Sequence, residues 1–138
     1  MTKITKKKKP GLLFSVETFI EKEGLFDPGA KILIGVSGGP DSMALFSLLT
    51  ELRLKWDLDL SVLYCHHGLR AAADGEEVFV RAWAKKLGCR FFSRKLPVRE
   101  LQKKTRRSLQ EAARELRYQA FGDYVKQENM DRVALAHT

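Results

Sequence analysis

The sequence contains little cysteine and no long apolar run. Cys65 and Cys89 are the two cysteines in 138 residues, and they do not form a CxxC pair. We therefore expect both thiols to be reduced and buried in a cytoplasmic protein. No apolar run reaches the roughly eighteen residues that a membrane span needs, so no membrane contact is expected. The basic N-terminus lacks the apolar segment of a signal peptide behind it, which argues against export.

Two common phosphate-binding motifs are also missing. Neither GxxxxGK[ST], with its lysine, nor GxGxxG occurs in the chain. The chain has instead an apolar, β-branched run, residues 32–36, that leads into two adjacent glycines. This pattern predicts a strand, a phosphate-sized loop and a helix N-terminus, where free backbone N–H groups favour an anion. The loop comprises Ser37, Gly38, Gly39, Pro40, Asp41 and Ser42.

The residue types in this loop suit a bound phosphate. Gly38 and Gly39 let the main chain approach a ligand closely because they carry no Cβ. Hydroxyls of Ser37 and Ser42 can donate hydrogen bonds, and the Asp41 carboxylate could hold a Mg²⁺ ion that bridges phosphate oxygens. The alternative is a plain turn in which Asp or Ser caps a helix.

Positive charge is concentrated in two places. The formal net charge is +8, and five lysines within residues 1–10 account for five of these charges, leaving +3. We expect residues 1–10 to be a basic, flexible tail and residues 11–138 to form one domain. A second basic cluster falls in a predicted loop and favours a polyanionic partner. Its members are Lys103, Lys104, Arg106 and Arg107.

Hydrophobic periodicity predicts alternating strands and helices. Strands are expected over residues 31–36, 58–65, 91–96 and 132–136, and helices over 12–23, 43–52, 78–87, 97–103 and 109–127. Capping-box spacing occurs at Asp74 with Glu77 and at Ser108 with Glu111. This alternation implies an α/β fold, a parallel sheet with helices on both faces. Ligands bind beyond the carboxyl ends of such strands, which groups the loop with residues 66–70 and 137–138.

Three segments resemble known enzymes. Residues 37–42 match SGGxDS, the pyrophosphate loop of N-type ATP pyrophosphatases, which split ATP between its α- and β-phosphates. Residues 67–70, HGLR, and 108–118, SLQEAARELRY, resemble two segments of tRNA(Ile)-lysidine synthetases. Without the resemblance, His66 and His67 would be expected to make hydrogen bonds and not to bind a metal. The helix that follows Ser108 would be expected to be a core helix with solvated arginines.

This resemblance implies a Rossmann-like fold of the adenine nucleotide alpha hydrolase type and a two-step reaction. The family uses ATP to adenylate the C2 carbonyl oxygen of the wobble cytidine in tRNA(Ile) with a CAU anticodon. The amino group of free lysine then displaces AMP to form lysidine. ATP and Mg²⁺ are the implied cofactors.

The resemblance also assigns roles to individual residues. The implied ATP-binding residues are Ser37, Gly38, Gly39, Pro40, Asp41, Ser42 and His67. The implied catalytic residues are Asp41, which would also hold Mg²⁺, Arg114 and Arg117. The implied tRNA contacts are Lys103, Lys104, Arg106 and Arg107.

The chain departs from the family at two points. His66 stands where the family usually has Asp or Asn, and the sequence ends before the family's acidic D-D-Q-x-E-T segment. We therefore expect an N-terminal portion of such an enzyme, truncated at its C-terminus. Two alternatives stay open. A tRNA thiolase of the same superfamily would need cysteines to carry sulfur, and a non-catalytic fragment would bind ATP or RNA without chemistry.

Overall fold

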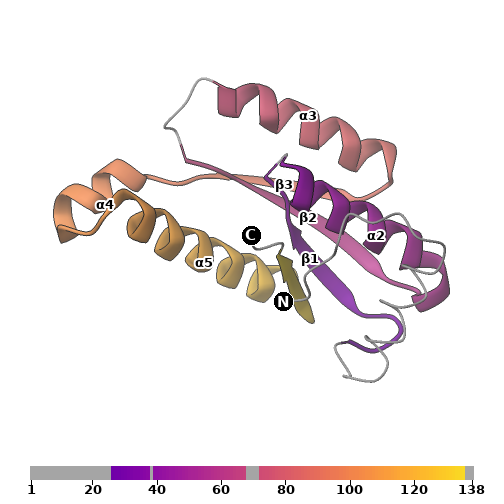
Figure 1. The fold of residues 1–138 in the computed structure, drawn as a ribbon. Helices are drawn as coiled ribbons and strands as arrows, with labels where there is room; N and C mark the ends of the chain where they lie inside the picture. The colour runs from indigo at the N-terminus through magenta and orange to yellow at the C-terminus, as the bar shows by residue number, and fades with distance from the viewer. Residues whose placement is uncertain (1–25, 38, 68–71, 136–138) are drawn as a thin grey trace.

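The computed structural model describes residues 26–37, 39–67 and 72–135. Strands and helices alternate along this part of the chain, as Figure 1 shows. In chain order the elements are β1 (Lys31–Gly35), α2 (Pro40–Trp56), β2 (Asp59–His66), α3 (Ala72–Lys86), β3 (Arg90–Lys95), α4 (Val98–Thr105), α5 (Leu109–Gln127) and β4 (Arg132–Leu135). The predicted α/β class is confirmed.

The four strands form one parallel sheet in the order β3-β2-β1-β4. Strand β1 is central, and its residues Ile32, Leu33 and Ile34 are buried because helices cover both of its faces. From β1 the chain builds outward through β2 to β3 and then returns to place β4 on the other side of β1. The carboxyl ends of β1 and β4 therefore flank the topological switch point, where ligands bind in such sheets.

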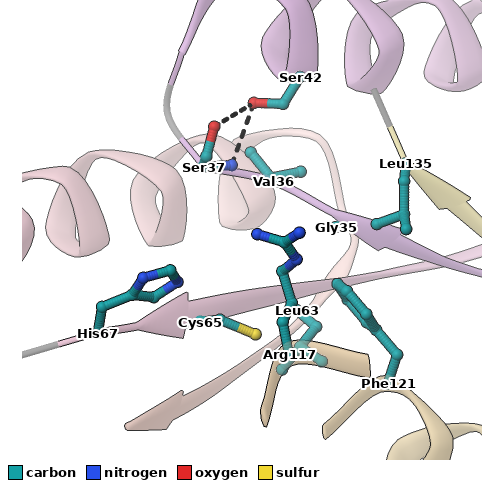
Figure 2. A pocket seen from close by; sticks show the side chains of 10 residues that line it. All are labelled: Gly35, Val36, Ser37, Ser42, Leu63, Cys65, His67, Arg117, Phe121 and Leu135. Carbon is teal, nitrogen blue, oxygen red and sulfur yellow. Dashed lines mark hydrogen bonds between the residues drawn. The ribbon is translucent and has the colours of Figure 1, made fainter. Parts of the chain in front are cut away.

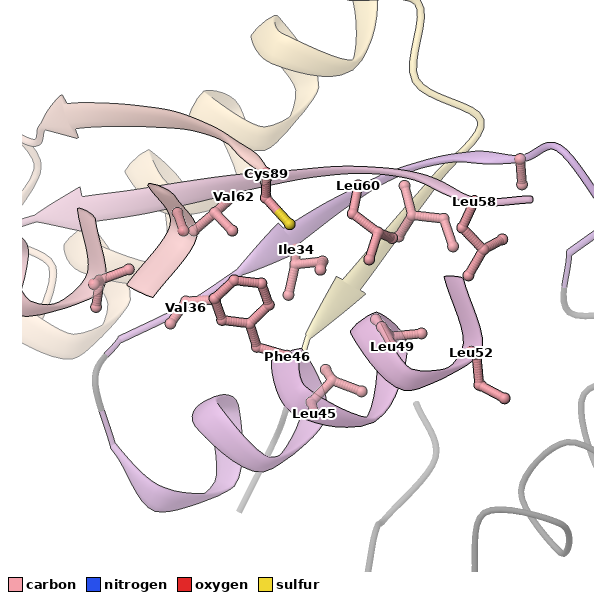
Figure 3. Packing of buried hydrophobic residues seen from close by; sticks show 14 of the residues in the cluster. Ile34, Val36, Leu45, Phe46, Leu49, Leu52, Leu58, Leu60, Val62 and Cys89 are labelled. Carbon is pink, nitrogen blue, oxygen red and sulfur yellow. The ribbon is translucent and has the colours of Figure 1, made fainter. Parts of the chain in front are cut away.

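Helices α2 and α3 pack on one face of the sheet (Figure 1). Phe46 and Leu49 of α2 pack with Ile34 and Leu60 of the strands in one buried cluster (Figure 3). Val80 of α3 belongs to the same cluster. This apolar contact fixes α2 against β1, so the loop between the two elements starts and ends on rigid supports.

Helices α4 and α5 cover the opposite face. The residues of α5 that approach the sheet are mostly small, with Ala112, Ala113 and Ala120 buried beside Leu33 and Leu63. Small side chains let the helix lie close to the strands, and the predicted helix over 109–127 is confirmed. One flank of α5 is thereby brought to the carboxyl end of β1.

The N-terminus of α3 differs from the prediction. Helix α3 begins at Ala72, so Asp74 lies inside its first turn and the predicted Asp74–Glu77 capping box is wrong. Glu77 instead accepts hydrogen bonds from Ser93 of β3 and, at 3.2 Å, from Arg81. Phe79 of α3 lies on the outer side of the helix and is 48% exposed. The hydrogen bond from Ser93 of β3 to Glu77 therefore takes the place of the capping contact that the sequence predicts.

Several expectations concern residues outside the described ranges. These are the tail at 1–10, the helix over 12–23, Gly38 and the groups at 68–70 and 137–138. Of the two cysteines, both free, Cys89 is buried and Cys65 is half-buried. Within the described residues, no helix combines the length and the apolar character needed to cross a bilayer.

Candidate functional site

A cavity of about 330 Å³ lies at the topological switch point, beyond the carboxyl end of β1 (Figure 2). Its walls come from β1 and the loop after it, from β2, from α5 and from the end of β4. The residues that line it are Gly35, Val36, Ser37, Ser42, Leu63, Cys65, His67, Arg117, Phe121 and Leu135. The structure thus brings Ser37, Ser42, His67 and Arg117, all predicted site residues, to one cavity.

The loop at the mouth of this cavity is held by its own serines. The Ser42 hydroxyl accepts a hydrogen bond from the backbone N–H of Ser37 at 3.1 Å and lies 3.1 Å from the Ser37 hydroxyl. It also donates to the Gly39 carbonyl at 3.2 Å, and the Ser37 hydroxyl accepts from the Gly39 N–H at 3.3 Å. These bonds fix the loop in a tight turn before any ligand arrives.

Helix α2 starts from this loop with an uncapped N-terminus. Gly39 is the extended N-cap residue, with φ −75° and ψ 164°, and makes no side-chain cap. Pro40 follows as the first helical residue, where a missing N–H costs nothing. The first-turn N–H groups and the helix dipole therefore favour an anion at the mouth of the cavity.

Asp41 lies in the first turn of α2 and is half-buried, but it is not among the residues that line the cavity. In the described part of the chain, no group of three or more His, Cys, Asp or Glu side chains gathers around a possible metal position. A single carboxylate fits Mg²⁺ that takes its other ligands from phosphate oxygens and water. The donor set therefore fits a magnesium ion delivered with a nucleotide, not an all-protein metal cage.

Arg117 supplies the positive charge of the cavity. Figure 2 shows its side chain reaching from α5 toward the Ser37–Ser42 loop. The side chain is half-buried, and no carboxylate among the described residues pairs with it. Such a guanidinium opposite an uncapped helix N-terminus makes the cavity attractive to a group with several negative oxygens.

Residues 12–138 match the family model of the PP-loop domain, an ATP-binding family. The chain belongs to the PP-loop family. The match covers all the described elements and includes the Ser37–Ser42 loop.

The PP-loop chain is similar to curated tRNA(Ile)-lysidine synthases. It is 40% identical to the Clostridium tetani protein over 119 residues, covering 86% of this chain and 26% of that protein. It is 37% identical to the Petrotoga mobilis protein over 119 residues, covering 86% of this chain and 38% of that protein. The Geobacter sulfurreducens protein is 39% identical over 127 residues, with 91% of this chain and 27% of that protein covered. The chain therefore spans well under half the length of these relatives.

A solved structure shares the fold. The U34-tRNA thiolase NcsA from Methanococcus maripaludis, a structure with a [4Fe-4S] cluster, superimposes with a TM-score of 0.76. The sequences are 18% identical, and the overlap covers 91% of this chain and 44% of that chain. At this identity the likeness establishes the Rossmann-like PP-loop fold alone.

Cys65 lies in the wall of the cavity at the switch point as a neutral thiol. Burial raises the pKa of the Cys65 thiol to about 11, although the positive charges of Arg117 and Arg94 oppose this shift. At neutral pH a thiol of this kind is almost fully protonated and is a poor nucleophile. Cys65 packs against the apolar cluster that includes Leu33 and Leu63.

The remaining predicted residues lie outside the cavity lining. Arg114 is exposed on α5, and its guanidinium lies 5.4 Å from the ring centre of Tyr118. The basic cluster is exposed around the junction of α4 and α5, and Arg107 there pairs with Glu115. Lys103 and Lys104 fall in the last turn of α4, and Arg106 caps it in the left-handed region, with φ 56°.

Sequence reasoning missed the apolar walls of the cavity. Gly35, Leu63, Phe121 and Leu135 come from four different elements, so no local pattern connects them. Gly35 was the one sequence signal for these walls, because a glycine at the end of a buried strand often marks a place where other groups approach the backbone closely. A Cβ at Gly35 would lie 2.7 Å from the Phe121 ring and would overlap the Leu135 side chain.

Proposed function

We propose that this domain binds ATP and forms the adenylating part of a tRNA(Ile)-lysidine synthetase. The adenylyl group would pass to the C2 carbonyl oxygen of the wobble cytidine in tRNA(Ile) with a CAU anticodon. The amino group of free lysine would then attack C2 and displace AMP. The observation that carries the proposal is the meeting of the Ser37–Ser42 loop and Arg117 in one cavity at the switch point.

The loop suits the leaving group of the first step. Pyrophosphate gains negative charge as the α–β bond breaks, and donors already in place stabilise that charge without reorganisation. The first-turn N–H groups of α2 and the hydroxyls of Ser37 and Ser42 are such donors. Asp41 would hold Mg²⁺, whose chemistry is to neutralise charge on the phosphate oxygens.

A guanidinium of α5 orients either the nucleotide phosphate or the carboxylate of lysine in this scheme. Both Arg114 and Arg117 match the family helix, and the cavity position favours Arg117. A planar guanidinium can bind two oxygens of a phosphate or carboxylate at once, which an ammonium group cannot do with fixed geometry. His67, which directly follows β2 and lines the cavity, would contact the nucleotide.

The basic cluster Lys103, Lys104, Arg106 and Arg107 would contact the tRNA backbone. All four residues are exposed and lie on the same side of the sheet as α5. Contacts of this kind give binding that weakens steeply as salt rises.

Two other functions, tRNA thiolation and ligand binding without chemistry, are distinguished from lysidine formation by the lysine-incorporation experiment described below. A tRNA thiolase has the same kind of loop, but the protonated Cys65 argues against sulfur transfer through that residue. A nucleotide- or RNA-binding domain without chemistry would bind ATP or tRNA but incorporate no lysine.

The deciding experiment is the incorporation of radiolabelled lysine into a tRNA(Ile) transcript in the presence of MgATP. A control transcript carries uridine at the wobble position. Label confined to the cytidine transcript supports lysidine formation by this chain. ATP binding without label would mean that the chain binds the nucleotide but does not complete the reaction.

A matched pair of variants tests Asp41. Asp41→Asn should abolish the Mg²⁺ dependence of ATP binding and lower any turnover by about 100-fold or more, because the charge that holds the metal on the phosphates is removed. Asp57→Asn makes the same change at the other end of α2, in a left-handed position with φ 52° that asparagine tolerates. Unchanged Mg²⁺ dependence in Asp41→Asn would rule out the metal assignment.

A further inference from the structure

One flank of α5 carries a row of positive and aromatic side chains that ends in the cavity. At 100° per residue, Arg114, Arg117, Tyr118 and Phe121 fall within one sector of the helix. Arg117 and Phe121 line the cavity. Arg114 lies about one turn N-terminal to Arg117, and Tyr118 lies about one turn N-terminal to Phe121. The row therefore connects the cavity with the junction of α4 and α5.

We propose that this flank holds an unpaired RNA segment and leads it from the basic junction to the cavity, with a base stacked on Tyr118. The proposal rests on the proposed function for taking tRNA as the partner. It adds a binding surface between the phosphate-binding junction and the reaction site, and it assigns Arg114 and Tyr118 to that surface.

Charge supports an anionic, extended partner. In the described part of the chain, Lys103, Lys104, Arg106 and Arg114 make no ion pair, whereas Arg107 is neutralised by Glu115. The distance along α5 from its first residue, Leu109, to Arg117 is about 12 Å, because a helix rises 1.5 Å per residue. A polynucleotide strand can bridge this distance, whereas a single small anion cannot.

The Tyr118 ring supports an unpaired base as the contacting group. Its side chain is 42% exposed although it carries a large apolar ring. The Arg114 guanidinium, 5.4 Å from the ring centre, restrains it through a cation–π contact. A base of a single strand can stack on such a ring, whereas bases inside a duplex are already stacked on each other. The combination favours the anticodon loop over paired regions.

The test compares two RNAs with the full 138-residue chain. The first probe is the anticodon stem-loop of tRNA(Ile), and the second is a fully paired RNA duplex of similar charge. We expect Tyr118→Ala to weaken stem-loop binding by about 5- to 100-fold, the range for loss of one base stack. Duplex binding should change by about twofold or less, because no unpaired base is available.

Three further variants sharpen the comparison. Tyr118→Phe keeps the ring and should restore stem-loop binding. Gln119→Ala removes the neighbouring exposed side chain on a different side of α5 and should leave both affinities unchanged. Arg114→Ala should lower the slope of log affinity against log salt by about 0.7, the value for one phosphate of a single strand.

The possible results divide cleanly. The stacking surface is overturned if Tyr118→Ala binds the stem-loop as tightly as the unaltered chain does. It is also overturned if Tyr118→Ala loses the same affinity for the stem-loop and for the duplex. A stem-loop effect that depends on Tyr118, in a chain that neither binds ATP nor incorporates lysine, keeps the surface and overturns the proposed function. A thermal unfolding midpoint measured for each variant separates these results from a loss of folding, and Tyr118→Phe provides the test if Tyr118→Ala unfolds.

Discussion

At the scale of single residues, Gly35 is the position where an added methyl group would do most damage to the cavity. A Cβ there would meet Phe121 at 2.7 Å and overlap Leu135, and both side chains belong to the cavity wall. We expect Gly35→Ala to lower the free energy of unfolding by about 1–3 kcal/mol, as overpacking in a core does. ATP binding should weaken as well, because the wall residues must move. Urea unfolding and nucleotide titration measure the two effects.

Gly122 provides the matched control for this prediction. It lies inside α5, and an added Cβ there would have no atom within 4 Å. Gly122→Ala should therefore raise the free energy of unfolding by about 0.5–1 kcal/mol, because alanine is the better helix residue. Similar effects of the two substitutions would contradict the close packing at Gly35.

Cys65 gives a second prediction at this scale. Because burial raises the pKa of its thiol to about 11, the thiolate at pH 8 is about one part in a thousand. Alkylation of Cys65 by iodoacetamide, followed by mass spectrometry of its peptide, should be slow at pH 8 and accelerate toward about pH 11. ATP should slow it, because Cys65 lines the cavity. Fast alkylation at pH 8 that ATP does not affect would contradict the burial of this thiol beside the nucleotide.

The raised pKa of Cys65 also makes the free energy of unfolding depend on pH. The folded state holds the Cys65 proton more tightly than the unfolded chain, so its contribution is complete at neutral pH. The contribution is lost as pH rises from the ordinary thiol value of 9.0 to about 11. Unfolding of Cys65→Ser should therefore depend less on pH in this range than that of the unaltered chain.

At the scale of elements, the N-terminus of α5 is stabilised by a complete capping box. The Ser108 hydroxyl accepts from the Glu111 N–H at 3.1 Å, and the Glu111 carboxylate accepts from the Ser108 N–H at 3.2 Å. We expect Ser108→Ala to lower the free energy of unfolding by about 1 kcal/mol at neutral pH. Gln110→Ala, on the exposed side of the same turn, is the control and should have little effect.

Acid should weaken this cap in a defined direction. Hydrogen bonds from the Ser108 side chain and backbone lower the pKa of Glu111. The stabilisation is therefore present above the ordinary glutamate pKa and is lost as pH falls through the lowered value. A difference between Ser108→Ala and the unaltered chain that stays constant from neutral to acidic pH would exclude the carboxylate from the cap.

The two capping patterns show what sequence can predict for an element. Ser108 and Glu111 follow a loop, and no side chain from another described element hydrogen-bonds to them. Local chemistry therefore decides, and the predicted capping box is confirmed. Glu77 has the same spacing from Asp74, but Ser93 of β3 donates a hydrogen bond to the Glu77 carboxylate. Helix α3 also begins at Ala72, two residues before Asp74. Strand positions were predicted within one or two residues because continuous apolar runs mark buried parallel strands.

The cavity walls show where prediction from sequence stopped. The SGGxDS loop was visible because its residues are consecutive. Arg114 and Arg117 could not be separated in sequence, since both match the same helix pattern, and the packing of α5 places Arg117 in the cavity lining. Phe121 and Leu135 were unpredictable as wall residues because their meeting depends on the return of β4 beside β1.

At the scale of the whole molecule, charge is distributed unevenly. The body after residue 10 carries a net charge of +3, with exposed basic residues concentrated at the α4–α5 junction. Combined replacement of Lys103, Lys104 and Arg106 by alanine should lower the salt slope of tRNA binding by about 2, at about 0.7 for each phosphate that is no longer neutralised. Filter binding over a range of salt concentrations measures this slope.

Replacement of Lys85 and Lys126 controls for net charge in that experiment. Both side chains are exposed, at the C-terminal ends of α3 and α5, away from the junction. Their removal should leave the salt slope nearly unchanged. A slope that falls in proportion to the number of charges removed, wherever they lie, would indicate general attraction to tRNA without a specific role for the junction.

Because Leu135 of β4 lines the cavity, a bound ligand should reduce how often the edge strand β4 separates from β1. Strand β4 has four residues and pairs with β1 on one side. Amide hydrogen exchange of β4 should therefore slow by about 100-fold at a ligand concentration about 100 times the Kd, since binding requires the closed strand. If β3, at the opposite edge, slows equally, the ligand stabilises the whole domain; if β4 slows more, the nucleotide itself holds the last strand in place.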